Sequence, residues 1–379
     1  MSSARPVNWP NTLFFILTPF IALPGAVWWA MSARFHPATL VLAGGLWLLV
    51  GLSITAGYHR LFSHRSYQTA WPVKWLFVIF GSAAFEGSVM DWSTDHRRHH
   101  RYQDKEKDPY AIYKGFWFAH ILWIFFKDWK PNPADAPDLW KDPVIRFQHR
   151  YFVPFASFMS FIFPMLVASL WGDPLGGLFV AGGIRLVLNQ QFTFAINSFC
   201  HLIGAQPYSD RHTARDSWVT ALITYGEGYH NFHHEFPADY RNGIRFYQWD
   251  PTKWLIYALS CVGLARNLHR IVPEKIVEKK ILMLEKRLAE KLANQPPRLV
   301  DMSTQMLMAA KMQIQFASEK LTELRAQYET LKKEKNESVH YQLKELRLKL
   351  RSAQLEFHHS VEIWKTTTKG ISRFPDFSG

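Results

Sequence analysis

Three short histidine-rich segments carry the chemistry that this sequence is equipped to perform. They hold eight of the 17 histidines and read His59-Arg-Leu-Phe-Ser-His64, His96-Arg-Arg-His99-His100 and His230-Asn-Phe-His233-His234. On a helix the spacing i, i+3, i+4 directs side chains to one face, so the second and third segments each present three imidazoles in a common direction. The spacing of five in the first segment separates its two rings, which suits ligands of two metals or a helix that ends between them.

The donor atoms limit which metals these segments could bind. Imidazole nitrogen suits Fe, Zn, Cu and Ni, and eight imidazoles exceed the three or four ligands of one zinc site, so we predict a dinuclear centre. Carboxylates are mostly absent from these segments, which therefore differ from the Glu-x-x-His pattern of soluble di-iron bundles. The two cysteines, Cys200 and Cys261, exclude a disulfide scaffold and a thiolate zinc site. A solvated or lipid-facing histidine cluster is the alternative, and it fits the scattered single histidines better than these three segments.

Four apolar runs are long enough to place the histidines beside a membrane, since a bilayer needs roughly 20 residues. They are residues 12–31, 38–57, 152–171 and 175–197, and short connections join them into two hairpins. Residues 58–150 contain fourteen Lys or Arg, whereas the short connections contain only Arg34, so we expect that segment and both termini to be cytoplasmic. Three more apolar runs, 73–90, 116–126 and 254–264, are predicted to lie at the interface or under the cytoplasmic domain.

The composition separates a first domain, residues 1–273, from a polar tail, residues 274–379. Hydrophobic residues make up 48% of the chain, which excludes general disorder. The net charge of +13 comes without a groove-reading motif, so we expect no nucleic-acid partner. In the tail we predict a helix over 274–293, a break at Gln295-Pro-Pro297 and a second helical segment to about residue 364. Leucines at three- and four-residue spacing indicate a coiled-coil-like seam, for which a solvated appendage, self-association and docking of a redox partner stay open.

The order of the histidine segments closely resembles that of the membrane-bound acyl-CoA desaturases, the stearoyl-CoA Δ9-desaturase family. Longer strings agree: WSTDHRRHH from Trp92, DPY from Asp108, GFWFAH from Gly115 and GEGYHNFHHEFPADY from Gly226. The resemblance covers about residues 11–270 and is to a bacterial-type member with a C-terminal extension. It implies an all-α integral membrane protein with four transmembrane helices in two hairpins and a cytoplasmic helical di-iron domain, followed by the coiled-coil-like tail.

The resemblance also implies a site. It adds a ninth histidine, His201, and Asn197, which acts through water, so the implied iron ligands are His59, His64, His96, His99, His100, His201, His230, His233, His234 and Asn197. Asp95 and Glu227 are candidates to orient imidazole N–H groups, with surface charges as the alternative. By resemblance Trp47 and Gly51 line the end of an acyl tunnel, although packing against lipid or a neighbouring helix explains them equally well. Phe194 is assigned to the same tunnel, and the unusual intramembrane Arg185 lies at its mouth or on a helix that leaves the bilayer.

The implied reaction is O2-dependent insertion of a cis double bond, Δ9 by resemblance, into a long saturated acyl chain. It uses two Fe(2+) per chain and electrons from a separate donor, such as ferredoxin or a b-type cytochrome with its reductase. We expect the donor to dock near Arg97, Arg98 and Arg101. Acyl-CoA is the expected substrate, but Thr94 and Phe194 stand where coenzyme A-using members have Arg and Trp, and Lys127-Asp128 replaces a basic pair, so an acyl-lipid stays open.

Two other functions fit the histidine pattern less well. One is a membrane hydroxylase on the same di-iron scaffold. The other is a metal transporter or store, which is disfavoured because transport ligands should line a path through the spans, whereas these histidines cluster at one predicted face. The expected location is a multi-pass protein of the bacterial inner membrane.

Overall fold

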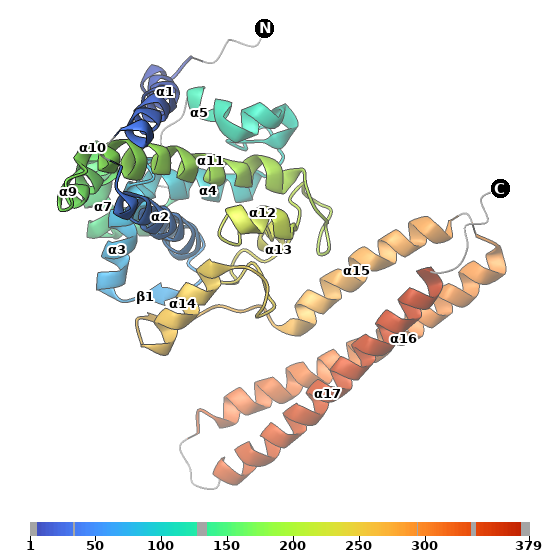
Figure 1. The fold of residues 1–379 in the computed structure, drawn as a ribbon. Helices are drawn as coiled ribbons and strands as arrows, with labels where there is room; N and C mark the ends of the chain where they lie inside the picture. The colour runs from blue at the N-terminus through green and yellow to red at the C-terminus, as the bar shows by residue number, and fades with distance from the viewer. Residues whose placement is uncertain (1–5, 33–34, 127–134, 294, 335–338, 373–379) are drawn as a thin grey trace. The chain divides into compact units, whose positions relative to one another are not determined.

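The computed structural model describes residues 6–32, 35–126, 135–293, 295–334 and 339–372. It divides the chain into two compact units, Met1–Ile271 and Val272–Gly379 (Figure 1). Within the described residues both units are built from helices. The exception is a short antiparallel pair in the first unit, β1 (Gln68–Thr69) with β2 (Ala265–Arg266), a detail that the all-α prediction missed.

Three helical segments of the first unit are long and apolar enough to cross a membrane: α1 (Trp9–Met31), α2 (Pro37–Leu52) with its continuation η1 (Ser53–Ser63), and the succession α8 (Phe152–Ser157), η5 (Phe158–Ile162) and α9 (Phe163–Ser169). Their apolar side chains are widely exposed, as a lipid-facing surface requires; Phe20 is 74% and Val41 76% exposed. Three of the four predicted runs therefore form membrane-competent helices. Arg34, which entered the orientation argument, lies outside the described residues.

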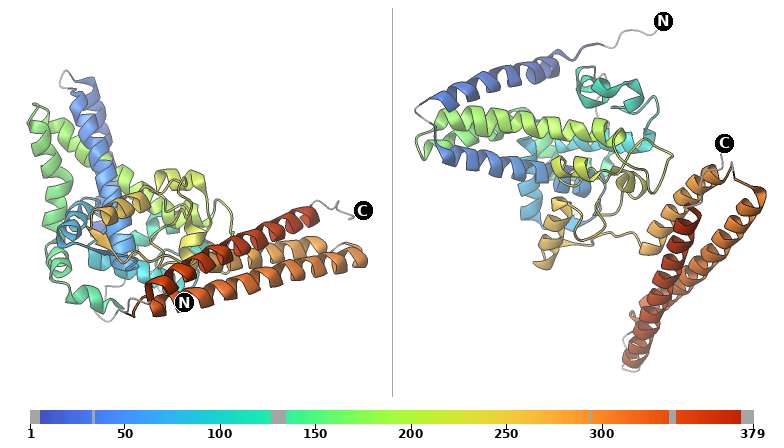
Figure 2. Two further views of the ribbon diagram at one scale, coloured as in Figure 1. Left: turned by 90° about the horizontal axis from the view of Figure 1, so that it is seen from below. Right: turned by 45° about the vertical axis from the view of Figure 1, so that its right-hand side comes forward.

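The fourth predicted run forms a continuous helical segment, α10 (Pro174–Gly176), η6 (Gly177–Ile184) and α11 (Arg185–Ser198), which leads into η7 (Phe199–His201). It does not meet the same length and hydropathy criterion as the other three. Buried polar side chains lie along it: Arg185 donates to the carbonyls of Ala83 and Ser160, and Asn189 donates to that of Trp47. The η6 segment packs against α1, α2 and α9 (Figure 2), but its crossing of the membrane stays a prediction.

The η1 segment is a π-helix, in which N–H groups donate to the carbonyl five residues back. The His64 N–H, at its end, donates to the carbonyl of His59 at 3.1 Å. This wider winding places residue i+5 close to residue i, and the two rings lie only 4.8 Å apart between centroids. The expectation that a spacing of five separates these rings is therefore wrong, because it assumed the winding of an α-helix.

The apolar run 73–90 does not form one helix. Helix α3 (Trp71–Ser82) spans twelve residues, about 18 Å, which is too short to cross a bilayer. The chain then turns through positive φ at Phe85 and Gly87, and Ser88 caps α4 (Val89–Tyr102) by accepting a hydrogen bond from the Asp91 N–H. This break brings the second histidine segment, which lies on α4, beside η1.

Shorter elements complete the first unit around a core that includes Val50, Tyr58, Phe77, Met90 and Ile145. They are η2 (Ile112–Lys114), η3 (Phe118–Leu122), α5 (Trp123–Phe125), α6 (Pro137–Lys141), α7 (Pro143–Arg150), α12 (Trp218–Ile223), α13 (His230–Glu235) and α14 (Pro251–Cys261). None of them is long enough to span a bilayer, which agrees with the interfacial position expected for runs 116–126 and 254–264.

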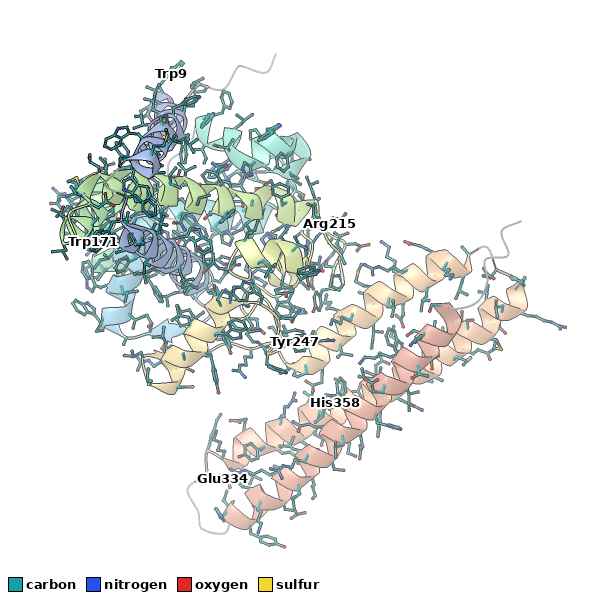
Figure 3. The ribbon with its side chains drawn as sticks, in the orientation of Figure 1. Trp9, Trp171, Arg215, Tyr247, Glu334 and His358 are labelled. Atoms are coloured by element: carbon teal, nitrogen blue, oxygen red, sulfur yellow. The ribbon has the colours of Figure 1, made fainter. Side chains whose placement is uncertain are left out.

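Within its described residues the second unit contains three helices, α15 (Pro273–Leu292), α16 (Pro297–Leu331) and α17 (Val339–Ser372). The single second segment predicted from the sequence is two helices: the chain leaves α16 near Glu334 (Figure 3), and residues 335–338 of the charged interruption lie outside the described residues. Helices α16 and α17 are antiparallel, because Lys320 pairs with Glu356 and Arg347 donates to Tyr328. Predicted seam residues therefore meet within one chain, where Leu321 and Phe357 share a core. Coiled-coil geometry stays a prediction.

Candidate metal centre

The nine predicted histidine ligands lie in two groups. His59, His64, His96, His100 and His233 form a five-histidine group, and His99, His201, His230 and His234 form a four-histidine group. Within each group one potential ligand atom from every residue lies within 4.8 Å of the others. They come from η1, α4, η7 and α13 or from the residue next to them, so four elements distant in sequence build the centre.

Helical spacing decides which group each histidine joins. On α4 the i, i+4 pair His96 and His100 belongs to the five-histidine group, while His99 belongs to the other. On α13 the i, i+4 pair His230 and His234 belongs to the four-histidine group, while His233 crosses to the five-histidine group. The two helices therefore each serve both groups, which fits a dinuclear arrangement better than two independent sites.

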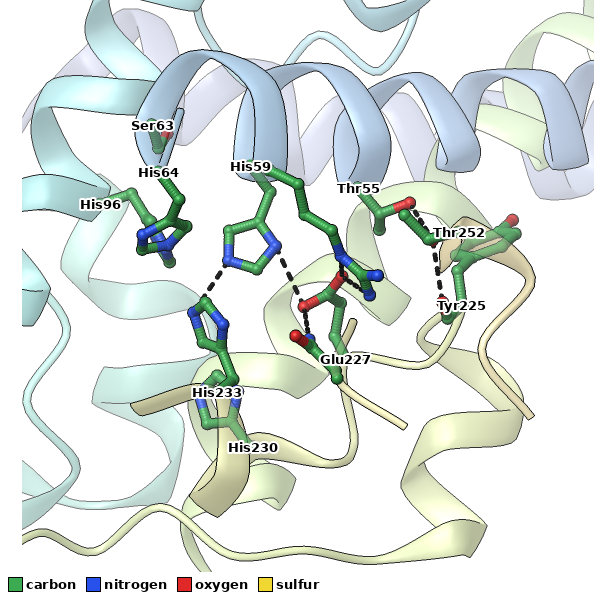
Figure 4. Close-up of polar contacts among 12 residues, drawn as sticks. Thr55, His59, Ser63, His64, His96, Tyr225, Glu227, His230, His233 and Thr252 are labelled. Carbon is green, nitrogen blue, oxygen red and sulfur yellow. Dashed lines mark hydrogen bonds and ion pairs between the residues drawn. The ribbon is translucent and has the colours of Figure 1, made fainter. Parts of the chain in front are cut away.

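The imidazoles of the five-histidine group approach one another through their Nε2 atoms, and His59, His64, His96 and His233 are drawn in Figure 4. The Nε2–Nε2 distances are 3.0 Å for His59 to His233, 2.8 Å for His64 to His96 and 3.0 Å for His233 to His100. A neutral imidazole has one N–H, so such a cluster cannot satisfy all of these nitrogens with hydrogen bonds among themselves. Convergent nitrogen lone pairs are the donor set that a divalent transition metal requires.

Glu227 fixes the orientation of His59. The Nδ1 atom of His59 lies 3.0 Å from the Glu227 carboxylate, which also accepts hydrogen bonds from Arg60 (Figure 4). With its proton on Nδ1, His59 presents a bare Nε2 to the group. Arg60 in turn pairs with Asp250 and donates to the carbonyl of Tyr240, so the buried carboxylate is compensated.

Two acceptors serve the four-histidine group in the same way. The Asp108 carboxylate lies 2.8 Å from His99 Nδ1. The Thr213 hydroxyl donates to Asp104 at 2.8 Å and lies 2.7 Å from His201 Nδ1, so it accepts the imidazole proton. The Nε2 atoms of His99 and His201 are buried and have no hydrogen-bonding partner among the described residues. Such nitrogens are suited to a metal.

The electrostatics of the cluster favour neutral imidazoles. Burial, and then repulsion from neighbouring histidines, lowers the pKa of His230, His233 and His234 well below its usual value. Burial followed by the same repulsion acts on His96 and His100. Neutral imidazole is the ligand form, so these residues are ready to bind metal near neutral pH.

Sequence reasoning found some of the orienting groups and missed others. Glu227 was interpreted either as a group that orients an imidazole or as a surface charge, and it contacts His59 Nδ1 in the buried interior. Asp95 lies in the wall of the cavity described below. Asp108, Thr213 and Asp104 were not predicted to orient imidazoles, although Asp108 stands in the DPY string, nine residues after His99.

A cavity of about 810 Å³ reaches the metal centre from the membrane helices. His59, His96, Asp95, Glu227 and Asn197 line one part of it, and Asn197 is not a member of either histidine group. Aromatic side chains, including Phe14, Phe15, Phe85, Phe152, Trp123 and Phe194, line much of the remainder, together with polar side chains such as Glu86, Asp91 and Asn11. A chamber with a largely aromatic wall fits a long aliphatic ligand.

Three residues assigned to the tunnel do not line this cavity. The Trp47 ring packs against Phe192 and Tyr225, and a Cβ on Gly51 would meet the Tyr225 ring. Gly51 lies one helical turn from Thr55, which does line the cavity, and Thr55 donates to the Gly51 carbonyl. Trp47 and Gly51 therefore stand behind the cavity wall, and Arg185 is held by backbone carbonyls in the helical core rather than at a cavity mouth.

The residues that bear on the acyl carrier and on docking of the electron donor have the following contacts. Thr94 is buried and donates to the Met90 carbonyl, while Lys127 and Asp128 lie outside the described residues. Arg97 makes a two-pronged hydrogen bond with Asp138 and Arg101 is exposed. Arg98 donates to the carbonyl of Lys107.

Comparisons with known proteins give the family. Residues 36–260 match the family model described as fatty acid desaturase. The chain is 46% identical to a probable acyl-CoA desaturase of Schizosaccharomyces pombe and 44% identical to acyl-CoA desaturase 1 of Saccharomyces cerevisiae, over 76% and 78% of this chain and 60% and 59% of theirs. It is 36% identical to human stearoyl-CoA desaturase 5, over 72% of this chain and 84% of that protein. The chain thus spans about three fifths of the length of the two yeast relatives. With its three membrane-competent helices and histidine groups, this membrane protein belongs to the fatty acid desaturase family.

Proposed function

We propose that this chain is an acyl-CoA desaturase that inserts a cis Δ9 double bond into a long saturated acyl chain, with two Fe(2+) held by the nine histidines. The observation that carries the proposal is the aromatic cavity of about 810 Å³ whose wall includes His59 and His96 of the five-histidine group. The names of the relatives support the substrate, because the yeast and human proteins are named for acyl-CoA and stearoyl-CoA.

The residues of the centre fit iron by their donor set of neutral imidazoles and by the bare Nε2 atoms of His99 and His201. Iron bound there supplies the oxidising power, drawn from O2, that unactivated C–H bonds require. Two adjacent methylenes lose two hydrogens, and O2 with two electrons and two protons becomes two waters. The electrons come from a separate protein.

The protein supplies position and exclusion of water. Phe85 and Phe194 bind the acyl chain as part of the cavity wall, which fixes the methylenes that lie nearest to His59 and His96. Glu227 and Asp108 hold protons on Nδ1 atoms, so that the Nε2 lone pairs stay directed at the metals. Asn197, in the same wall, is proposed to act on the centre through water.

The direct test is expression in a strain that requires unsaturated fatty acids, followed by gas chromatography with double-bond location. Growth and a new Δ9 alkene support the proposal. His99→Ala should abolish the alkene, whereas His269→Ala, at an exposed histidine outside the centre, should not. A hydroxylated chain without an alkene would favour the hydroxylase alternative, and no alkene despite two bound irons would refute the desaturase. Feeding labelled acyl-CoA to the purified protein separates acyl-CoA from acyl-lipid substrates.

We further propose four membrane spans with the histidine groups and both termini on the cytoplasmic side, in a bacterial inner membrane. The basic residues of segment 58–150 support this orientation. A reporter fused after Lys105 should give a cytoplasmic signal, and a signal on the opposite side would overturn the topology. Docking of a ferredoxin or a b-type cytochrome beside exposed Arg101, and self-association of the second unit, stay predictions of the sequence.

A further inference from the structure

His212, which is not one of the nine predicted ligands, lies beside the four-histidine group. Its ring centroid lies 5.5 Å from that of His234, with the two rings inclined at 48°. Both of its ring nitrogens are buried, and neither has a hydrogen-bonding partner among the described residues. Burying a polar atom without a partner opposes folding, so this side chain is expected to have one in the working protein.

The neighbouring ligand has the complementary need. His234 turns its Nε2 toward the Nε2 of His230, 3.0 Å away, which leaves its Nδ1 directed out of the group. That Nδ1 is buried and also has no partner among the described residues. A metal-binding imidazole donates its outer N–H to an acceptor that fixes its tautomer and ring angle.

Three ligands of the centre already have such an acceptor. Glu227 serves His59, Asp108 serves His99, and Thr213 serves His201. His230 and His234 each have a buried Nδ1 without a partner among the described residues, and for His234 the His212 ring, outside the ligand set, lies 5.5 Å away between centroids. A neutral imidazole carries one acceptor nitrogen, which is what the outer nitrogen of His234 requires.

The loop that carries His212 is held on both sides of it. The Gln206 side chain donates to the His212 carbonyl at 2.5 Å, and the Thr213 N–H donates to Asp104 at 2.8 Å. Further along, the Arg215 N–H donates to the carbonyl of Cys200, directly before the ligand His201. The loop therefore cannot drift away from the group without also disturbing the Thr213 contact to His201.

We propose that His212 is a positioning residue of the four-histidine group, which accepts a hydrogen bond from Nδ1–H of His234 through one water. The bond holds the proton on Nδ1 and leaves Nε2 of His234 bare for the metal. This inference rests on the proposed metal binding and adds to it an orienting group. It predicts an effect confined to one of the two metals.

The test uses the full-length chain in detergent, stripped of metal and titrated with Co²⁺ against a competing chelator. Three variants are compared with the unmodified chain: His212→Leu removes the acceptor, His212→Gln restores one in the form of an amide oxygen, and His269→Leu removes an exposed histidine elsewhere. Visible absorption of the bound Co²⁺ reports the geometry of each site. Thermal unfolding of the metal-free chains reports whether a variant folds.

The unmodified chain and His269→Leu are expected to bind two Co²⁺. His212→Leu should bind one Co²⁺ as before and the other about 10- to 100-fold more weakly, with an altered absorption band. His212→Gln should recover most of that loss, which a purely space-filling role of the ring would not allow.

Several results would overturn the inference. Unchanged affinity and absorption in His212→Leu would do so, as would equal weakening of both sites or a loss that His212→Gln fails to recover. These outcomes leave the proposed function standing. An unmodified chain that binds no Co²⁺ would overturn the proposed metal centre and this inference together.

Discussion

Replacing Glu227 by Gln is the most severe test of the proposed centre, because this buried carboxylate contacts both His59 and the buried Arg60. Its side chain and that of Arg60 are each 1% exposed. Glu227 accepts from Arg60 at 2.8 Å and lies 3.0 Å from His59 Nδ1. The substitution keeps the shape of the side chain and removes one buried negative charge.

The expected loss of stability follows from what Arg60 keeps. Removing one partner of a buried ion pair typically costs about 3–5 kcal/mol. Arg60 still faces Asp250 at 3.0 Å and the Tyr240 carbonyl at 2.8 Å, so we expect the lower end of that range. At about 2–4 °C per kcal/mol, a loss of about 3 kcal/mol lowers the Tm by about 6–12 °C. The weaker hold on His59 should also reduce metal affinity of the five-histidine group about 10- to 100-fold.

The assay is thermal unfolding in detergent together with metal titration. Asp138→Asn is the matched control, since it also removes a carboxylate from a two-pronged arginine pair, but Asp138 is 33% exposed and lies outside the centre. We expect a loss of about 1 kcal/mol or less for the control, because partly exposed pairs contribute little, and no change in metal binding. The result that refutes the reasoning is a Glu227→Gln variant that matches the control in both measurements.

Other predictions concern the second group, pH and the tunnel. Asp108→Asn should weaken the binding of one of the two metals about 10- to 100-fold, because a neutral amide replaces the charged acceptor for His99, and metal titration checks it. The metal-free protein should lose stability as the pH falls below about 6.5, because His233 and His234 are buried with lowered pKa values and take up protons more readily once unfolded; a Tm at pH 5.5 equal to that at pH 7.5 would contradict this. Trp47→Ala should shift the preferred chain length upward by opening space behind the cavity wall, and an unchanged product profile would remove Trp47 from the tunnel.

The sequence predicted the nine histidines that the structure brings together in two groups, because eight of them are clustered by type and spacing. Clustered imidazoles are rare enough to stand out, and the i, i+3, i+4 pattern correctly indicated convergence. It did not show that His99 and His233 each cross to the group opposite their helical neighbours, since that depends on how α4 and α13 face one another. Contacts between distant elements leave no trace in local spacing.

The groups that orient the imidazoles and the lining of the cavity were harder to predict, because they too depend on contacts between distant parts of the chain. Thr213 reaches His201 from a loop twelve residues away, and Asp104 reaches Thr213 across a separation of 109 residues. Nothing in the local sequence of either residue indicates that role. Trp47 and Gly51 were assigned to the tunnel by resemblance, and both contact the Tyr225 ring, which their spacing in the sequence could not show. The interruption of the apolar run 73–90 at Phe85 was also not predicted, because it depends on the positive φ of Phe85, which the structure shows.

The close approach of the His59 and His64 rings depends on the π-helical winding of residues 53–63. In a π-helix each N–H donates to the carbonyl five residues back rather than four, and residues 53–63 continue α2 with this winding. Wound as an ordinary α-helix, the same spacing of five would turn the two rings about 140° apart, because each residue advances about 100° around the helix axis. Grafting this segment onto an ordinary α-helix would therefore not transfer the close pair of imidazoles.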